Sequence, residues 1–240
     1  MKPSILAKII DFLFPRFCPV CGNRLAGGEE CICMACNLHL PRTDTWENPY
    51  ENEMAKMFWH LIPIEKCCAL FYYKGHSPVS NILYRLKYGN RPDIAFQMGL
   101  LLAQEGTKAN FFDDIDAIIP IPLARNRMRQ RGYNQSEEIA RGIAEATRLP
   151  IRTDIVRRTI FKESQTHKNR WQRHANVSHV FELIQQSADS QTKSGSLAGK
   201  HFLIIDDVCT TGATIRSCCQ AIMQAGNVKF SILTVGYANG

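Results

Sequence analysis

One strand-to-helix junction constrains the fold of this chain more than any other feature. The segment Phe202–Ile215 reads FLIIDDVCTTGATI, an apolar run that ends in two adjacent acids and continues into a threonine-rich loop. The pattern predicts a buried strand at His201–Ile205 and a helix at Thr214–Ala225. A buried strand that passes through a short glycine-containing loop into a helix is typical of parallel sheets.

The same alternation of apolar runs and helical patterns extends over most of the chain. Further strands are predicted at Lys66–Tyr73, Ile115–Ile121 and Val228–Val235, with a weaker one at Thr153–Thr159. Helices are predicted through Val79–Leu86, Ile94–Leu102 and Asn134–Thr147. Asn134 is the expected N-cap of the last helix, with Glu137 in a capping-box-like position. We therefore predict an α/β fold with a mainly parallel sheet flanked by helices.

Composition places the chain among soluble globular proteins. Of its 240 residues, 45% are hydrophobic and 21% charged, which argues against wholesale disorder and against a polytopic membrane protein. No run approaches the ~18 uncharged apolar residues of a transmembrane helix, so no transmembrane segment is predicted. No cleavage site of a signal peptide follows the apolar start, and we expect a cytoplasmic protein. The amphipathic segment Ile5–Phe14 is expected to pack on the same chain, although a membrane or partner surface is an alternative.

Charge and cysteine content indicate the kinds of ligand. The chain has 29 Lys and Arg against 22 Asp and Glu, and the resulting charge of +7 favours anionic partners such as phosphates, nucleic acid or an acidic membrane. Cys18 and Cys21 form one C-x2-C pair, and Cys33 and Cys36 form a second. Two such pairs predict a closed, structural zinc site, with Cys31 as a competing ligand to Cys33. Reduced or redox-active thiols without metal are the alternative.

The other cysteines fit a core. Cys67 and Cys68 lie in a predicted strand, and Cys218 and Cys219 lie on the apolar stripe of a predicted helix, so we expect buried, inert thiols.

The acidic junction has the composition of a sugar-phosphate site. Backbone N–H groups at a helix N-terminus, together with the hydroxyls of Thr210, Thr211 and Thr214, can hold a phosphate. Gly212 allows the backbone to approach that anion closely. Asp206 and Asp207 then suit a ligand that also carries hydroxyls or Mg²⁺, as a phosphorylated ribose does. The alternative is a capped helix beside a solvated acid pair.

At these residues the chain resembles the type I phosphoribosyltransferases, which bind 5-phosphoribosyl-1-pyrophosphate (PRPP). The resemblance implies that Asp206 and Asp207 hold the ribose hydroxyls, directly or through Mg²⁺. It implies that the loop binds the 5′-phosphate through Val208, Cys209, Thr210, Thr211, Gly212, Ala213 and Thr214. Cys209 departs from the family pattern, in which an aliphatic residue is commoner. The pyrophosphate contact falls on the segment Pro122 to Arg127, and we select Pro122, Leu123 and Arg125.

A narrower resemblance covers essentially the whole chain. The four-cysteine segment with its Leu40-Pro41 exit is similar to the ComF/GntX family, and so are several later motifs, namely Leu86-Lys-Tyr88, Ile119-Pro-Ile-Pro122, Arg131-Gly-Tyr-Asn-Gln135, Gln165 with Arg173, and Asn176-Val177. That family is associated with DNA uptake in natural competence. The resemblance implies a zinc-ribbon module at residues 1–45 and a phosphoribosyltransferase-like domain at 46–240.

Two basic segments complete the pattern. Arg125, Arg127, Arg129 and Arg131 alternate after Pro122, and arginine suits phosphate because its fork binds two oxygens. Arg157–Arg173 is the second segment, which by resemblance spans the loop that closes over the substrate. With Trp171 or Phe161 stacking on bases it could instead bind single-stranded DNA, and a solvated basic face is the simplest alternative.

These residues are compatible with two functions. The first is Mg²⁺-dependent transfer of phosphoribose from PRPP to an unidentified acceptor. The second is a non-catalytic protein that senses PRPP or a nucleotide and binds single-stranded DNA beside the competence DNA-translocation proteins. The scattered His167, His174 and His179 are interpreted as non-ligands, and no nucleophile–base pair is recognisable. Enzymatic activity, the acceptor and the oligomeric state stay open.

Overall fold

A computed structural model describes residues 15–159, 180–184 and 196–238 of the chain. The predictions for Ile5–Phe14 and for positions 160–173 of the second basic segment lie outside these residues, as do the three scattered histidines and the motif residues from 165 to 177.

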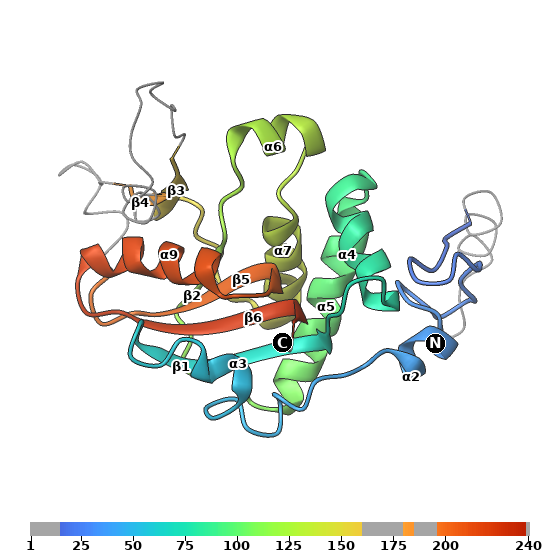
Figure 1. Cartoon of the computed structure of the whole chain (residues 1–240), viewed down its shortest axis with the longest axis horizontal. Helices are drawn as coiled ribbons and strands as arrows, with labels where there is room; N and C mark the ends of the chain where they lie inside the picture. Colours follow the sequence, from blue (N-terminus) through green and yellow to red (C-terminus); the bar gives the residue numbers. More distant parts are fainter. Residues whose placement is uncertain (1–14, 160–179, 185–195, 239–240) are drawn as a thin grey trace, which may run out of the picture.

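The core of the molecule is a four-stranded parallel sheet with the order β1-β6-β5-β2 (Figure 1). Its strands are β1 (Ile64–Tyr72), β2 (Ala117–Pro120), β5 (His201–Cys209) and β6 (Lys229–Tyr237). The predicted strands are thereby confirmed, but β5 extends four residues beyond the predicted end. It does so because β6 continues to pair with it, with Asp206 opposite Thr234 and Cys209 opposite Tyr237.

The weak strand predicted at Thr153–Thr159 belongs to a different sheet. It contains β3 (Val156–Arg158), which pairs antiparallel with β4 (Phe181–Leu183) in a separate two-stranded sheet. The weak strand is therefore present, but it does not join the parallel sheet.

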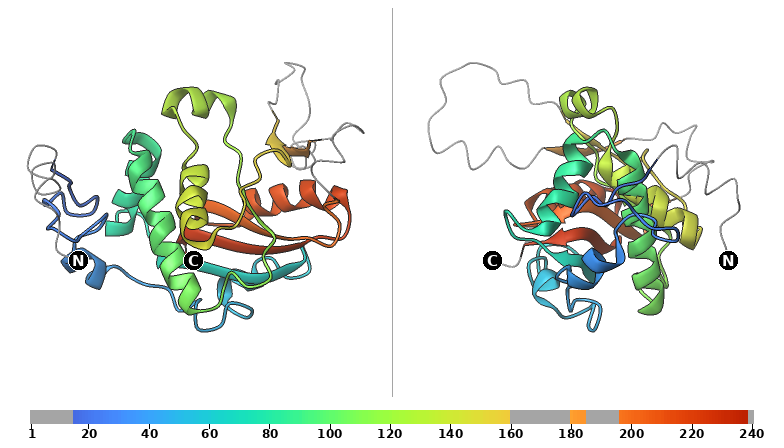
Figure 2. Two further views of the ribbon diagram at one scale, coloured as in Figure 1. Left: turned by 180° about the vertical axis from the view of Figure 1, so that it is seen from behind. Right: turned by 90° about the vertical axis from the view of Figure 1, so that its right-hand side faces the viewer.

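Helices cover both faces of the parallel sheet (Figures 1 and 2). The helices on one face are α4 (Pro78–Tyr88), α5 (Pro92–Lys108) and α7 (Gln135–Thr147), and those on the other face are α3 (Glu53–Lys56) and α9 (Ala213–Ile222), which a 3-10 turn extends to Ala225. Successive side chains of β5 point to opposite faces of the sheet. Leu203 and Ile205 therefore join the core under α5 and α7, and Phe202 and Ile204 join the core under α9. The arrangement is a three-layer α/β sandwich.

Two glycines allow α5 and α7 to lie in close contact (Figure 2, left). A Cβ atom on Gly99 would lie 2.1 Å from the carbonyl oxygen of Ile139, and one on Gly142 would lie 2.1 Å from that of Phe96. The backbones therefore meet directly, and this contact fixes the position of the α7 N-terminus relative to the sheet.

The cysteine-rich segment packs against the same layer as α5. Its only helix in the described residues is α2 (Met34–His39), and its apolar residues Leu25, Ile32 and Leu40 join the core formed by α4, α5 and α7. The chain then runs beside β1, since the Tyr72 N–H donates to the carbonyl of Pro41 over 2.8 Å. The domain boundary at residue 45 stays a prediction. Among the described helices, none is both long enough and apolar enough to cross a membrane.

Candidate functional site

The acid pair lies inside the end of the central strand β5. Asp206 and Asp207 are buried, with 8% and 4% of their surfaces exposed. Both belong to the strand and not to the loop that follows it, because β6 pairs with β5 as far as Cys209. Carboxyl ends of parallel strands are the usual location of ligand sites in open α/β sheets. The structure therefore places the two predicted acids at a position suited to a ligand.

Each acid has a partner from a different helix. The Ser136 hydroxyl, in the first turn of α7, donates to Asp206 Oδ1 over 3.1 Å, and the Asp207 N–H donates to the same oxygen over 2.9 Å. Lys87 in the last turn of α4 places its Nζ 2.8 Å from Asp207 Oδ2. Neither Lys87 nor Ser136 was predicted from the sequence to have a role. Lys87 lies in the motif Leu86-Lys-Tyr88, and Ser136 directly follows the motif Arg131–Gln135. These motifs are the sequence feature from which a role for the two residues could have been predicted.

Burial makes the acid pair electrostatically costly. Desolvation and the neighbouring Asp207 raise the pKa of Asp206 to about 7. A bound cation would offset this cost by favouring the ionised form.

The loop after the acids leads directly into α9. Thr210 and Thr211 are exposed, and Gly212 is the N-cap of α9 with a φ of +68°. A side chain at Gly212 would be strained by that angle and would meet the Phe58 ring at 2.8 Å. Ala213 and Thr214 are the first exposed residues of the helix, Val208 is half-buried and Cys209 is buried. The first turn of α9, whose N–H groups have no partner within the helix, therefore follows directly from this exposed loop.

The motif Leu86-Lys-Tyr88 on α4 contacts the motif Arg131–Gln135 at the start of α7. The Tyr133 hydroxyl donates to the carbonyl of Leu86 over 2.7 Å, and the Arg131 guanidinium lies 5.4 Å from the centre of the Tyr88 ring. Asn134 is the N-cap of α7, as predicted, and accepts from the Ser136 N–H over 3.1 Å. These contacts link α4 to the start of α7. They therefore set the positions of the two helices that supply partners to the acid pair.

The predicted pyrophosphate residues do not all face one hollow. Pro122 and Leu123 line a hollow of about 200 Å³ at the β2 edge, with Asn134, Glu137 and Arg152. Arg125 begins α6 (Arg125–Arg131) and lines a second hollow of about 350 Å³. The other residues lining that hollow are Arg157, Arg158, Thr159 and Glu182.

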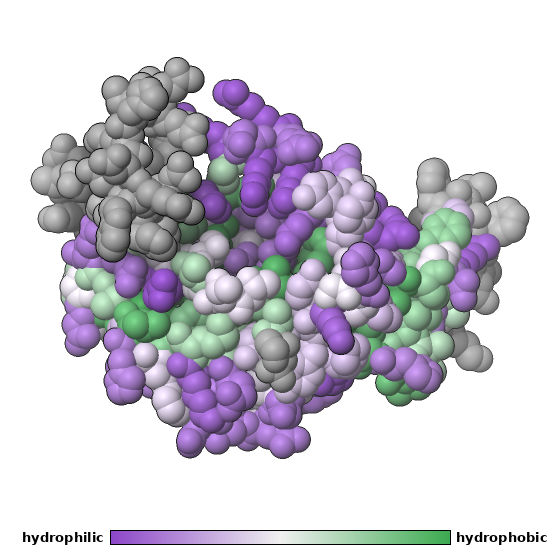
Figure 3. Space-filling view, in the orientation of Figure 1, coloured by the Kyte–Doolittle hydropathy of each residue, from purple (hydrophilic) through white to green (hydrophobic). Residues whose placement is uncertain are grey.

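Arg158 connects this second hollow to the acids. Burial and the nearby Arg127 lower its pKa, whereas Asp206 counteracts the shift. Hydrophilic side chains gather over α6 at the top of the molecule (Figure 3). An anion with several phosphate groups would meet arginine from both α6 and β3 there.

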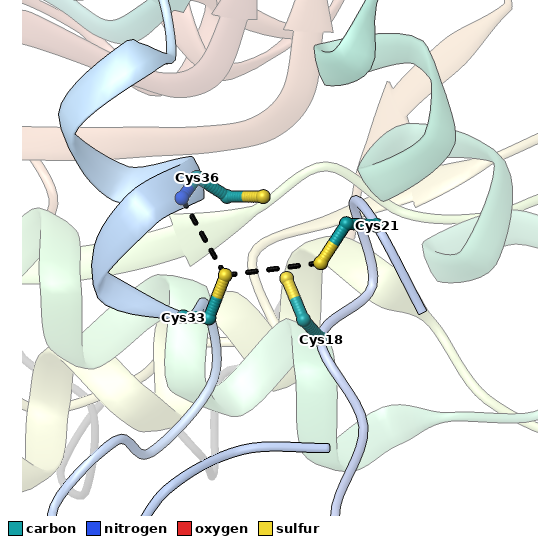
Figure 4. Close-up of side chains that lie close together, drawn as sticks. All are labelled: Cys18, Cys21, Cys33 and Cys36. Carbon is teal, nitrogen blue, oxygen red and sulfur yellow. Dashed lines mark hydrogen bonds between the residues drawn. The ribbon is translucent and has the colours of Figure 1, made fainter. Parts of the chain in front are cut away.

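The four cysteines of the two C-x2-C pairs point toward one another (Figure 4). The sulfur atoms of Cys18, Cys21, Cys33 and Cys36 all lie within 4.8 Å of one another. Sγ of Cys21 is 3.8 Å from Sγ of Cys33, and tetrahedral Zn–S bonds of about 2.3 Å require a separation of about 3.8 Å. The backbone N–H of Cys36 donates to Cys33 Sγ over 3.4 Å. The cluster can therefore bind zinc.

The remaining cysteines lie apart from this cluster. Cys31 does not belong to the four-sulfur group, and burial raises its pKa to about 12. Cys67 and Cys68 of β1 and Cys218 and Cys219 of α9 are fully buried in the two cores, as predicted.

The chain is similar to a phosphoribosyl transferase domain family and to proteins named for DNA utilization or competence. Residues 135–238 match the phosphoribosyl transferase domain family. The chain is 27% identical over 223 residues to "DNA utilization protein YhgH" of Shigella flexneri, a match that covers 88% of this chain and 92% of that protein. It is 25% identical over 157 residues to "Competence protein F" of Haemophilus influenzae, over 63% of this chain and 66% of that one. Glutamine PRPP amidotransferase from B. subtilis aligns over 62% of this chain and 30% of its own, with 20% identity and a TM-score of 0.40.

Proposed function

The chain belongs to the ComF family, and from this premise we propose that its phosphoribosyltransferase-like domain binds PRPP with Mg²⁺ at the end of β5. The observation that carries the proposal is a buried pair of carboxylates, Asp206 and Asp207, directly before a loop that opens onto the N-terminus of α9. Carboxylates suit ribose hydroxyls or a divalent cation, and the helix N-terminus suits a phosphate.

The donor set fits magnesium. Mg²⁺ prefers oxygen ligands and is usually held by one or two carboxylates together with substrate phosphates. Asp206 and Asp207 are two such carboxylates, and Lys87 is a cation that already lies against one of them. When bound, Mg²⁺ would neutralise charge on the pyrophosphate leaving group.

The chain's own residues orient the ligand. In the proposed complex Asp206 and Asp207 would hold the ribose hydroxyls, and Thr210, Thr211 and Thr214 would surround the 5′-phosphate with the N–H groups of α9. Arg125 and Arg158 would face the pyrophosphate, because both line the arginine-rich hollow. The ligand would thus be held at its ribose hydroxyls, its 5′-phosphate and its pyrophosphate, with the C1 atom of the ribose between the acids and the arginines.

We propose that the four-cysteine cluster holds a structural zinc ion. Four protein ligands fill a tetrahedral site, which leaves no position for a substrate. The ion would stabilise a segment whose only described helix has six residues.

Transfer of phosphoribose to an acceptor is the proposed reaction. Departure of pyrophosphate from C1 can be assisted by electrostatics alone, so the chemistry does not require a general base at the sugar. The names of the relatives connect them with DNA use and competence, and we propose a link of this chain to DNA uptake on that basis. The alternative is a protein without catalysis that senses PRPP or a nucleotide and binds single-stranded DNA.

Calorimetric titration with PRPP and Mg²⁺ tests the proposal. We expect the zinc-loaded protein to bind PRPP only when Mg²⁺ is present, and Asp206→Asn combined with Asp207→Asn to lose binding. Glu145→Gln is the matched control, because Glu145 is an exposed carboxylate on α7. Failure of the unaltered protein to bind PRPP would refute the proposed site.

A further inference from the structure

A pair of tyrosines stands exposed on α4 beside the acid pair. Tyr84 and Tyr88 are 64% and 59% exposed, among the most exposed large apolar or aromatic side chains of the described residues. They lie one turn apart on the helix, and their ring centres are 5.0 Å apart at an angle of 40°. Two exposed rings side by side form an apolar patch on an otherwise polar helix surface, and such patches are common at ligand-binding surfaces.

Arginine lies against this aromatic pair. The Arg131 guanidinium lies over the Tyr88 ring at 5.4 Å and is held in place by a 2.9 Å hydrogen bond to Gln135. This contact orders the Tyr88 ring before any ligand binds, which lowers the entropy cost of binding.

The helices that carry the tyrosines and the neighbouring arginines contain basic residues and no acidic ones. The segment from Pro78 to Asn90 contains Arg85 and Lys87 and no acid, and α6 contains four arginines and no acid. Within the described parts of the chain, Arg125, Arg127 and Arg129 have no carboxylate within 4.0 Å. The hydrophilic surface over α6 in Figure 3 corresponds to this arginine-rich helix.

We propose that the surface formed by Tyr84, Tyr88 and the arginines of α6 binds single-stranded nucleic acid. Unpaired bases stack on exposed aromatic rings, while a row of cations follows the phosphate backbone. Duplex DNA cannot use the tyrosines in this way because its bases are already stacked. This inference deepens the alternative function proposed above, and it assigns the strand to residues different from Arg157–Arg173.

The location of the surface has a consequence for the acid pair. Lys87 lies on α4 between the two tyrosines in sequence and pairs with Asp207. A strand stacked on Tyr84 and Tyr88 therefore passes the edge of the proposed phosphoribose site, and we expect PRPP and the strand to influence each other's affinity.

Fluorescence anisotropy with a labelled oligothymidylate of about 20 nucleotides tests the proposal. Tyr84→Ala and Tyr88→Ala should each weaken binding at least about fivefold, which is the low end for loss of one stacked base. Tyr84→Phe and Tyr88→Phe should stay within about twofold, since the ring is retained. Arg129→Gln should reduce the slope of log affinity against log salt by about 0.7. Tyr50→Ala is the matched control, because Tyr50 is 58% exposed and its ring lies near Lys66 of β1.

Three results would overturn the proposal. The first is no strand binding by the unaltered protein, and the second is equal affinity for a duplex of the same length. The third is displacement of the strand by a free nucleobase with the same tyrosine dependence, which would make the pair an acceptor-base site. Calorimetry with PRPP on Tyr84→Ala separates this test from that of the proposed function, because Tyr84 contacts neither the acid pair nor Arg131 in the described residues and that variant should bind PRPP normally.

Discussion

Replacing Asp206 by asparagine should stabilise the ligand-free protein at neutral and alkaline pH. Asp206 is buried next to a second carboxylate, and only the Ser136 hydroxyl and one backbone N–H donate to it within the described residues. Asparagine has nearly the same shape. Its oxygen can take the place of Oδ1 and accept both hydrogen bonds, from the Ser136 hydroxyl and from the Asp207 N–H. The substitution therefore removes a charge without leaving a polar group unsatisfied.

The pKa of Asp206 sets the size of the effect. Desolvation and the neighbouring Asp207 raise that pKa from 3.8 to about 7. The unfolded chain ionises at lower pH than the folded one, so folding stability falls as pH rises between these two values and is constant above the higher one. The full shift corresponds to about 4 kcal/mol at 1.36 kcal/mol per pH unit. The raised pKa already includes the two hydrogen bonds that favour the ionised form, so the gain for Asp206→Asn should reach about 4 kcal/mol above pH 7.

Urea unfolding of both proteins at about pH 5 and pH 8 measures this gain. We expect the advantage of Asp206→Asn to be about 2.5 kcal/mol larger at pH 8 than at pH 5, because the penalty in the unaltered protein grows with pH. The measurement is made without PRPP or Mg²⁺, since either would stabilise only the unaltered protein. An advantage that is absent or independent of pH would refute burial as the source of the raised pKa.

Three further substitutions test other parts of the structure. Lys87→Met should destabilise the metal-free protein by about 1–3 kcal/mol at pH 8, because Asp207 loses its counter-ion. Mg²⁺ should then raise the melting temperature of this variant more than that of the unaltered protein, and equal increases would contradict the reasoning. Cys33→Ser should lose bound zinc, measured by atomic emission, whereas Cys31→Ser should keep it; the reverse result would exchange the two ligands. Gly99→Ala should cost about 2 kcal/mol or more in urea unfolding, because its Cβ would overlap a carbonyl of α7. Gly27→Ala, where no atom lies within 4 Å, is the control for that clash and should stay within about 0.5 kcal/mol.

Much of the fold could be predicted because it depends on local patterns. The strand before Asp206 and the helix after Gly212 follow from an apolar run and a helical stripe. Asn134 follows from the preference of asparagine for N-caps. The separate pairing of β3 with β4 could not be predicted, because β4 is three residues long and carries little pattern of its own.

The chemistry of the candidate site divides in the same way. The sequence alone determined which groups could bind a sugar phosphate and which sulfurs could bind zinc, since those residues lie next to one another along the chain. Only the tertiary structure decided that Lys87 and Ser136 are the partners of the acids, because helices distant in sequence bring them to β5. It also decided the raised pKa of Asp206, which depends on burial, and the exposure of Tyr84 and Tyr88, which depends on the side of α4 that packs against the core. The sequence specifies which side chains are present, whereas the distances between them and the desolvation of the acids arise only when the helices pack on the sheet.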